Sequence, residues 1–265
     1  MLDLSSITTV LFDMDGVLYR GQQVLEGVGE LQAFLTVQGI AYGCITNNAS
    51  MTPAQYEAKL AAMGITMAAA QVITSALATG SYLRGAYPRG TSALIVGMDG
   101  LREALLGDGH FVEELEHPEL VVQGADFELT YAKLKRACLA IRRGARYIAT
   151  NPDKTFPSEE GLIPGAGAVM ALLQAATDAE PFVIGKPAPT MFYIAVELLG
   201  GTAATTLVIG DRLDTDIAGA NNAGMPSALV LTGVSTLEEL ETSPTQPTAV
   251  FADLVGLLAM WKGQI

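Results

Sequence analysis

Several residue types are scarce in this sequence, and each shortage narrows the classes of protein to consider. The 265 residues include only two Cys, two His and one Trp. Cys44 and Cys138 lie far apart in apolar segments, which favours buried, reduced thiols over a disulfide framework or a metal cluster. His110 and His117 share the acidic stretch DGHFVEELEHPE, which is typical of a solvated face. We assign neither histidine a catalytic role.

Basic residues are also few. The chain has 15 Lys and Arg against 28 Asp and Glu, a net charge of −13. Proteins that bind the nucleic-acid backbone need basic patches, so a nucleic-acid partner is not expected. An anionic substrate would have to be met by a cation placed locally in its binding site.

Long hydrophobic runs are missing, although hydrophobic residues make up 50% of the chain and the mean hydropathy is +0.35. No stretch approaches the roughly 20 apolar residues that a membrane-spanning helix needs. The most apolar C-terminal stretch, residues 250–261, is broken by Asp253. The first ten residues, MLDLSSITTV, lack the basic and long apolar regions of a secretory signal. We therefore expect a cytoplasmic protein with no membrane partner.

Short apolar runs alternate with helical patterns along most of the chain. The run at residues 9–12 is followed by a helical pattern at 29–38, a strand at 40–46 and a helix that begins at Pro53. This alternation predicts βαβ units, and hence an α/β fold with a Rossmann-like, doubly wound parallel sheet. Later strands of the same kind are expected at residues 182–184, 206–209, 228–231 and 248–251.

The middle of the chain predicts a second α/β unit. It has strand patterns at residues 92–97, 120–124 and 146–150, helical patterns at 101–106, 131–142 and 169–176, and a polar loop at 151–167. We expect a core domain from residues 1–80 and 181–265, with a second domain, residues 81–180, inserted into it.

Polar residues follow the ends of four predicted core strands. The clusters are Asp13 with Asp15, Thr46 with Asn47 and Asn48, Lys186, and Asp211 with Asp216. Taken singly, each fits a turn, a helix cap or a surface lysine. In an open parallel sheet, however, ligands bind outside the carboxyl ends of the strands, so residues far apart in sequence can meet in one crevice. Together the four clusters predict one active site.

These motifs, DMDGV, TNN, GKP and GDRLDTDI, resemble the four motifs of the haloacid dehalogenase (HAD) superfamily of phosphohydrolases. Their combination is similar to subfamily IIA, which contains NagD, 4-nitrophenyl phosphatase, phosphoglycolate phosphatase and pyridoxal phosphatase. The resemblance spans nearly the whole chain. It implies a HAD-like core, and it implies that the inserted domain is an α/β cap that covers the active site and reads the leaving group.

The resemblance also implies roles for the motif residues. Asp13 would be the nucleophile that forms an aspartyl-phosphate, and Asp15 would be the acid that protonates the leaving group and later activates water. Thr46, Asn47 and Asn48 would bind phosphoryl oxygens, and Lys186 would hold the nucleophile and the phosphoryl charge together. The residues expected to ligate Mg²⁺ are Asp13, Asp211 and, through its main-chain carbonyl, Asp15.

Two further aspartates in the fourth motif are less tightly assigned. Asp216 is expected to act on the metal through a neighbouring ligand or a water. Asp214 fits the N-terminal turn of a helix, where a carboxylate is stabilised by the dipole, and the sequence leaves open which of the two touches the metal.

The expected cap carries the candidates for substrate choice. Asp153, Lys154 and Phe156 lie in the predicted loop and are the candidate specificity residues. Relatives that act on pyridoxal phosphate tend to carry a histidine near Phe156, so that substrate is disfavoured. The expected partner is a small phosphorylated metabolite, and a homodimer could form through the amphipathic helix at residues 131–141.

The leading hypothesis is thus a Mg²⁺-dependent phosphatase of small phosphate monoesters. A phosphotransferase or mutase would use the same intermediate with another acceptor. A phospho-accepting signalling domain shares the parallel sheet, an accepting Asp and a Lys, but is about half this length and lacks the acid two places after the accepting Asp.

Overall fold

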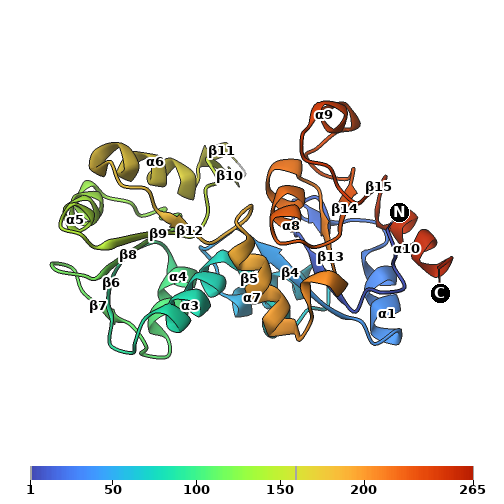
Figure 1. The fold of residues 1–265 in the computed structure, drawn as a ribbon, viewed down its shortest axis with the longest axis horizontal. Coiled ribbons are helices and arrows are strands. Elements are labelled where there is room, and N and C mark those ends of the chain that lie inside the picture. The colour runs from blue at the N-terminus through green and yellow to red at the C-terminus, as the bar shows by residue number, and fades with distance from the viewer. Residues whose placement is uncertain (1, 159, 265) are drawn as a thin grey trace. The chain divides into compact units, whose positions relative to one another are not determined.

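A computed structural model describes residues 2–158 and 160–264 (Figure 1). The chain divides into two compact units. The core unit comprises residues 2–46, 54–73 and 186–264, and the inserted unit comprises residues 47–53 and 74–185. The chain therefore passes from the core to the inserted unit and back.

The core unit is built on a six-stranded sheet in the order β15-β14-β13-β1-β4-β5. Its strands are β1 (Thr9–Phe12), β4 (Ala41–Thr46), β5 (Val72–Thr74), β13 (Thr206–Gly210), β14 (Ser227–Val230) and β15 (Ala249–Phe251). β1 pairs in parallel with both β13 and β4, so the chain order reverses beside β1. All residues of β1, β13 and β14 are buried, as expected of strands covered on both faces.

Helices pack around this sheet. They are α1 (Val28–Val37), α2 (Pro53–Ala62), α7 (Pro189–Leu199), α8 (Ala218–Asn222), α9 (Leu237–Thr242) and α10 (Leu254–Lys262), with short turns η1 (Ala69–Gln71), η2 (Ala203–Thr205) and η3 (Leu213–Ile217). A hairpin of β2 (Tyr19–Arg20) and β3 (Gln23–Val24) follows β1. α7 packs against β1 and β4, and α1 packs against α10. The two ends of the chain meet, because the Gln264 side chain bonds the backbone of Leu2 and Leu4.

The inserted unit has its own parallel sheet, in the order β12-β9-β8-β6-β7. Its strands are β6 (Ser92–Val96), β7 (Val112–Glu113), β8 (Leu120–Gln123), β9 (Arg146–Ala149) and β12 (Phe182–Val183), and its helices are α3 (Ser75–Ala86), α4 (Asp99–Leu106), α5 (Tyr131–Arg142) and α6 (Ala166–Thr177). In Figure 1, α6 lies above β8 and β9, while α3 and α4 lie below β9 and β12. An antiparallel hairpin of β10 (Thr155–Ser158) and β11 (Gly161–Pro164) precedes α6.

The predicted α/β class with a doubly wound parallel core and a second α/β unit is confirmed. The structure differs from the sequence prediction in several places. The strand expected in the core at residues 182–184 is β12, which pairs with β9 in the sheet of the inserted unit. The expected boundary at residues 80/81 falls inside α3, and the division lies before that helix. The loop predicted at residues 151–167 contains the β10–β11 hairpin, and α9 lies between the strands expected at residues 228–231 and 248–251. The hairpin was missed because its strands are only four residues long and each contains a Pro.

No helix in the described part of the chain is long and apolar enough to cross a membrane. The helices α3, α5 and α6 have 12 residues each, against the roughly 20 that a bilayer requires.

The packing of the central strand gives a stability prediction. Leu11 on β1 is fully buried, so Leu11→Ala removes apolar contacts and leaves a cavity between sheet and helices. We expect a loss of about 2–5 kcal/mol in the free energy of unfolding, measured by urea titration. Val37→Ala is the control, because Val37 is 81% exposed at the end of α1. Equal effects of the two substitutions would contradict the assigned core.

Candidate active site

The Lys186 side chain joins two of the predicted motifs in the core unit. Its Nζ lies 2.5 Å from Asp13 Oδ1 and 2.6 Å from Asp216 Oδ1, and it also donates to the carbonyl of Ile45 at 3.5 Å. The lysine and Asp216 side chains are 4% and 1% exposed, and that of Asp13 is 13% exposed. Burial would lower the pKa of Lys186, but Asp13 and Asp216 raise it above its ordinary value. The ammonium is therefore a fixed positive charge between two carboxylates.

Asp211 stands at the end of β13 beside this cluster. Its Oδ2 accepts the backbone N–H of Val234 at 2.7 Å, whereas its buried Oδ1 has no hydrogen-bond partner in the described structure. Burial, together with the negative charge of Asp216, raises the pKa of Asp211 to about 6. A buried carboxylate oxygen without a partner is costly, so Asp211 Oδ1 is free to bind a ligand.

Two glycines let the backbone approach the Asp211 carboxylate. Gly16 has φ of +80°, and a Cβ there would lie 2.6 Å from Asp211 Oδ2. A Cβ on Gly233 would also overlap the Asp211 carboxylate. Thr232 Oγ1 donates to the Gly16 carbonyl at 2.6 Å, which ties the turn after β1 to the loop after β14. A larger residue at either position would displace the carboxylate.

Asp13, Asp211 and Asp216 form the group best suited to hold a metal. One carboxylate oxygen of each lies within 4.8 Å of the others. Burial raises the pKa of Asp13 well above its usual range; Lys186 opposes this shift, and Asp216 and Asp211 add to it. Three carboxylates against one ammonium leave an excess of two negative charges when all are ionised. A divalent cation with oxygen ligands would balance that excess and would take up Asp211 Oδ1.

Asp15 differs from Asp13 in its surroundings. Asp15 is an exposed residue in the turn after β1, and its backbone forms an isolated β-bridge with Tyr19. Desolvation by the packed residues around it raises the pKa of Asp15, while Lys59 and Lys186 oppose this rise. A carboxyl that is accessible and holds its proton more firmly than usual suits a general acid.

The fourth motif separates its two later aspartates. Asp216 is buried, and its Oδ2 accepts the backbone N–H of Arg212 at 3.1 Å. Asp214 is 69% exposed and pairs with the Arg212 guanidinium at 3.1 and 2.9 Å. The structure thus brings Asp216 into the cluster with Lys186 and turns Asp214 toward Arg212.

The second motif is divided between the two units. Thr46 ends β4 in the core unit, and Asn47 and Asn48 begin the first segment of the inserted unit. Asn48 Oδ1 accepts hydrogen bonds from the backbone N–H of Ser50 at 2.8 Å and from Ser50 Oγ at 2.7 Å. These bonds form a local turn. The binding of phosphate by these three residues stays a prediction.

The candidate specificity residues lie in the inserted unit. Phe156 on β10 packs against Phe127 with ring centroids 5.4 Å apart. Lys154 is exposed. Asp153 accepts a hydrogen bond from the Asn47 side chain at 3.1 Å, so it contacts the second motif.

Sequence reasoning missed several residues that shape the site. Lys59 on α2 donates to the Tyr19 hydroxyl at 3.2 Å and lies 4.6 Å from the Tyr19 ring centroid. It was missed because a lysine in a helix is typical of a solvated face. The Gly233 contact could have been suspected, because Thr232-Gly233 directly follows a predicted strand end.

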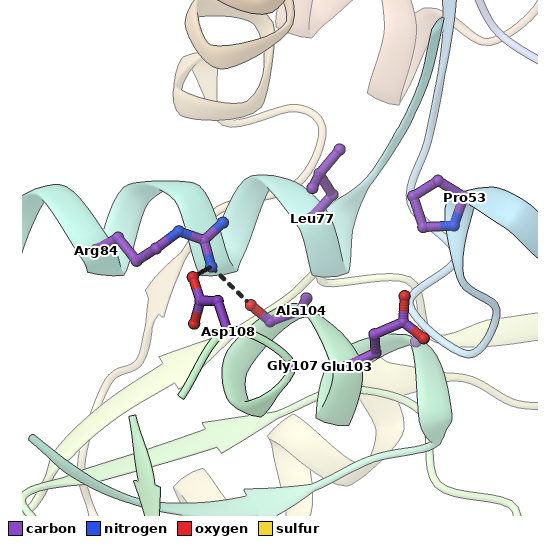
Figure 2. A pocket seen from close by; sticks show the side chains of 8 residues that line it. Pro53, Leu77, Arg84, Glu103, Ala104, Gly107 and Asp108 are labelled. Carbon is purple, nitrogen blue, oxygen red and sulfur yellow. Dashed lines mark hydrogen bonds and ion pairs between the residues drawn. The ribbon is translucent and has the colours of Figure 1, made fainter. Parts of the chain in front are cut away.

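An open pocket of about 500 Å³ lies within the inserted unit, between α3 and α4 (Figure 2). Arg84 lines it, and its Nη1 is held by the Ala104 carbonyl at 2.9 Å and by Asp108 at 3.5 Å. None of the motif residues lines this pocket. Arg84 and Asp108 are already engaged with each other, and the pocket has no assigned role.

Two family profiles and a curated relative match this chain. The profile of the haloacid dehalogenase-like hydrolases matches residues 10–110, and a HAD-hydrolase-like profile matches residues 183–257. An acid sugar phosphatase of Staphylococcus aureus (strain USA300) is 41% identical over 244 residues, which cover 92% of this chain and 94% of the relative.

Two solved structures are similar over nearly the whole chain. A 4-nitrophenylphosphatase from Thermotoga maritima has a TM-score of 0.90 and 36% identity, covering 98% of this chain and 99% of its own. A glycerol phosphate phosphatase from Mycobacterium tuberculosis, in complex with magnesium, has a TM-score of 0.88 and 36% identity. The match covers 97% of this chain and 78% of the phosphatase chain.

The doubly wound parallel sheet, with Asp13 and Asp211 directly after the neighbouring strands β1 and β13, is the fold of an α/β enzyme. The chain belongs to the haloacid dehalogenase-like hydrolase family. The predicted resemblance to this family, and to its NagD and 4-nitrophenyl phosphatase branch, is confirmed.

The raised pKa of Asp211 predicts a pH dependence of stability in metal-free protein. The folded state holds this proton up to about pH 6, against an ordinary value of 3.8. The stabilisation is therefore complete below the ordinary pKa and is lost as pH rises through about 6. The free energy of unfolding is measured by urea titration in the presence of chelator. Between about pH 4 and 7 it should fall by up to roughly 3 kcal/mol more for the wild type than for Asp211→Asn. A pH-independent difference between the two proteins would contradict the assignment.

Proposed function

We propose that this protein is a Mg²⁺-dependent phosphatase that hydrolyses small phosphate monoesters through an aspartyl-phosphate on Asp13. The observation that carries the proposal is the cluster in which Lys186 bridges Asp13 and Asp216 while Asp211 keeps a buried, unpartnered oxygen. The relatives' names support the reaction, since all three act on phosphate esters and one was solved with magnesium.

The residues present fit Mg²⁺. This ion prefers one or two carboxylates together with water and phosphate oxygens. Asp13, Asp211 and the main-chain carbonyl of Asp15 would hold it, and the open Oδ1 of Asp211 supports this choice. When bound, the metal supplies positive charge that lets a phosphate dianion approach a carboxylate nucleophile.

The chain's own residues account for the two chemical steps. In the first, a carboxylate oxygen of Asp13 bonds to phosphorus as the bond to the leaving oxygen breaks, and Asp15 donates its proton to that oxygen. In the second, Asp15 takes a proton from water as the water oxygen bonds to phosphorus. The bond to Asp13 then breaks, which releases inorganic phosphate and leaves Asp13 as a carboxylate and Asp15 protonated, as at the start.

Lys186 serves both steps without moving a proton. Its fixed charge holds the Asp13 carboxylate in place and would offset charge on the transferring phosphoryl group. Thr46, followed by Asn47 and Asn48, is proposed to bind the remaining phosphoryl oxygens.

The relatives' substrates indicate the substrate class. Their names cover a sugar phosphate, glycerol phosphate and 4-nitrophenyl phosphate, which share a small alcohol or phenol leaving group. We infer a small phosphorylated metabolite, chosen by the inserted unit. Phosphate release from a panel of sugar phosphates, phosphoglycolate, nucleoside monophosphates and aryl phosphates would identify it.

The nucleophile is tested with 4-nitrophenyl phosphate. Phosphate release should require Mg²⁺, stop with chelator and fall by at least about 10³-fold in Asp13→Asn, because the amide cannot form the intermediate. Asp178→Asn is the control, since Asp178 is an exposed residue at the end of α6. Turnover by Asp13→Asn close to that of the wild type would exclude the assignment. Transfer of phosphate to an added alcohol in place of water would instead indicate a phosphotransferase.

The acid is tested by changing the leaving group. Asp15→Asn cannot donate a proton, so hydrolysis of alkyl phosphates should fall by roughly 10²–10⁴-fold. Hydrolysis of 4-nitrophenyl phosphate should fall less, because its leaving group departs without protonation. First-turnover rates with both substrates measure the difference, and an equal loss for both would remove Asp15 from the role of general acid.

A further inference from the structure

Asn47 is held by a network of side chains within the inserted unit. We call Asn47, Ser75, Asn151 and Asp153 the Asn47 network. Asn47 directly follows Thr46, the last residue of β4, whereas Asn151 and Asp153 follow β9. Ser75 is the first residue of α3. Segments from three parts of the sequence thus meet at one residue of the second motif.

The network fixes the main chain of Asn47. Its carbonyl oxygen accepts two hydrogen bonds, from Ser75 Oγ at 2.6 Å and from Asn151 Nδ2 at 2.6 Å. These two bonds use both lone pairs of the oxygen. Asn47, Ser75 and Asn151 are 7%, 0% and 4% exposed. Two short bonds to one buried carbonyl leave that peptide little freedom to rotate.

The side chain of Asn47 is fixed as well. Its Nδ2 donates to Asp153 Oδ1 at 3.1 Å, and the Asp153 N–H donates to Asn151 Oδ1 at 3.1 Å. Asp153 is therefore oriented by its own backbone, and one of its carboxylate oxygens is turned toward Asn47. This contact differs from that expected of a residue that reads the leaving group.

The end of β9 also holds the chain where it leaves the inserted unit. The Gly185 N–H donates to the Thr150 carbonyl at 2.8 Å, and a Cβ on Gly185 would lie 2.6 Å from Asn47 Oδ1. Asn47 comes one residue after Thr46, and Gly185 comes one residue before Lys186. The segment 150–153 thus anchors the residues next to two proposed phosphate-binding residues.

We propose that Asn151 and Asp153 are positioning residues, which fix the peptide after Thr46 through Asn47 and so support phosphate binding for every substrate alike. The proposal rests on the phosphatase function proposed above. It replaces the sequence expectation that Asp153 selects the substrate.

The test compares Asp153→Ala with Asp153→Asn. Alanine removes the hydrogen bond between Asn47 Nδ2 and the residue 153 side chain, so kcat should fall by roughly 10–100-fold, by the same factor for aryl and alkyl phosphates. Asparagine keeps an acceptor oxygen and should stay within about 3-fold of the wild type. Asn151→Ala should resemble Asp153→Ala, and Glu128→Ala, an exposed carboxylate of the same unit, should resemble the wild type.

Several results would overturn the proposal. A changed substrate ranking in Asp153→Ala, without a common loss, would make Asp153 a specificity residue. Equal loss in Asp153→Asn and Asp153→Ala would show that the charge matters and not the hydrogen bond. Unchanged kcat in Asp153→Ala, with Asp13→Asn inactive in the same assay, would refute positioning and leave the proposed function standing.

A binding measurement separates the two proposals. Calorimetric titration with inorganic phosphate, in the presence of Mg²⁺, should give a Kd raised about 10-fold in Asp153→Ala and unchanged in Asp153→Asn. If the wild type released no phosphate from any ester, the proposed function would fail, and this titration would still decide on positioning. Circular dichroism of each variant verifies that it is folded.

Discussion

The ion pairs of Lys186 hold the core site together. A buried ammonium is costly unless it is paired and hydrogen-bonded, and the same holds for the carboxylates around it. Lys186 bonds Asp13 at the end of β1 and Asp216 after β13, two segments separated by most of the chain. Removing any one of the three would leave an uncompensated buried charge. The strand ends are thus brought together by electrostatics as well as by sheet pairing.

Lys186 does not pair with every carboxylate of the cluster, because Asp211 adds a third carboxylate that Lys186 does not bond. Gly16 and Gly233 pack against that carboxylate, and Val234 binds one of its oxygens. A fold selected for stability alone would gain by replacing Asp211 with a neutral residue. Its presence in a negatively charged cluster fits a site for a cation, since perturbed carboxylates are common at functional sites.

Sequence reasoning succeeded where one physical rule governs the residue. Strands buried on both faces read as unbroken apolar runs, so β1 and β13 were predicted, and the ends of neighbouring parallel strands converge, so Asp13 and Asp211 were expected together. Lys186 bonds Asp13 although the strand before it, β12, pairs in the sheet of the inserted unit. Sequence reasoning failed where the signal depends on tertiary contacts. The predicted strand end before Gly233 does not show how closely this glycine approaches Asp211, and α3 could not be recognised beyond the short strand that precedes it.

The inserted unit shows why the sequence alone suggests Asp153 for substrate choice and gives no sign of its contact with Asn47. A polar residue in a loop after a strand suggests ligand contact, but the sequence cannot show that Asn47, more than a hundred positions earlier, lies within hydrogen-bond distance. Asn47 and Gly185 each lie where the chain passes between the inserted unit and the core unit, so both positions need a fixed backbone. Residues at the end of β9 meet that structural need, because Asn151 donates to the Asn47 carbonyl and the Thr150 carbonyl accepts the Gly185 N–H.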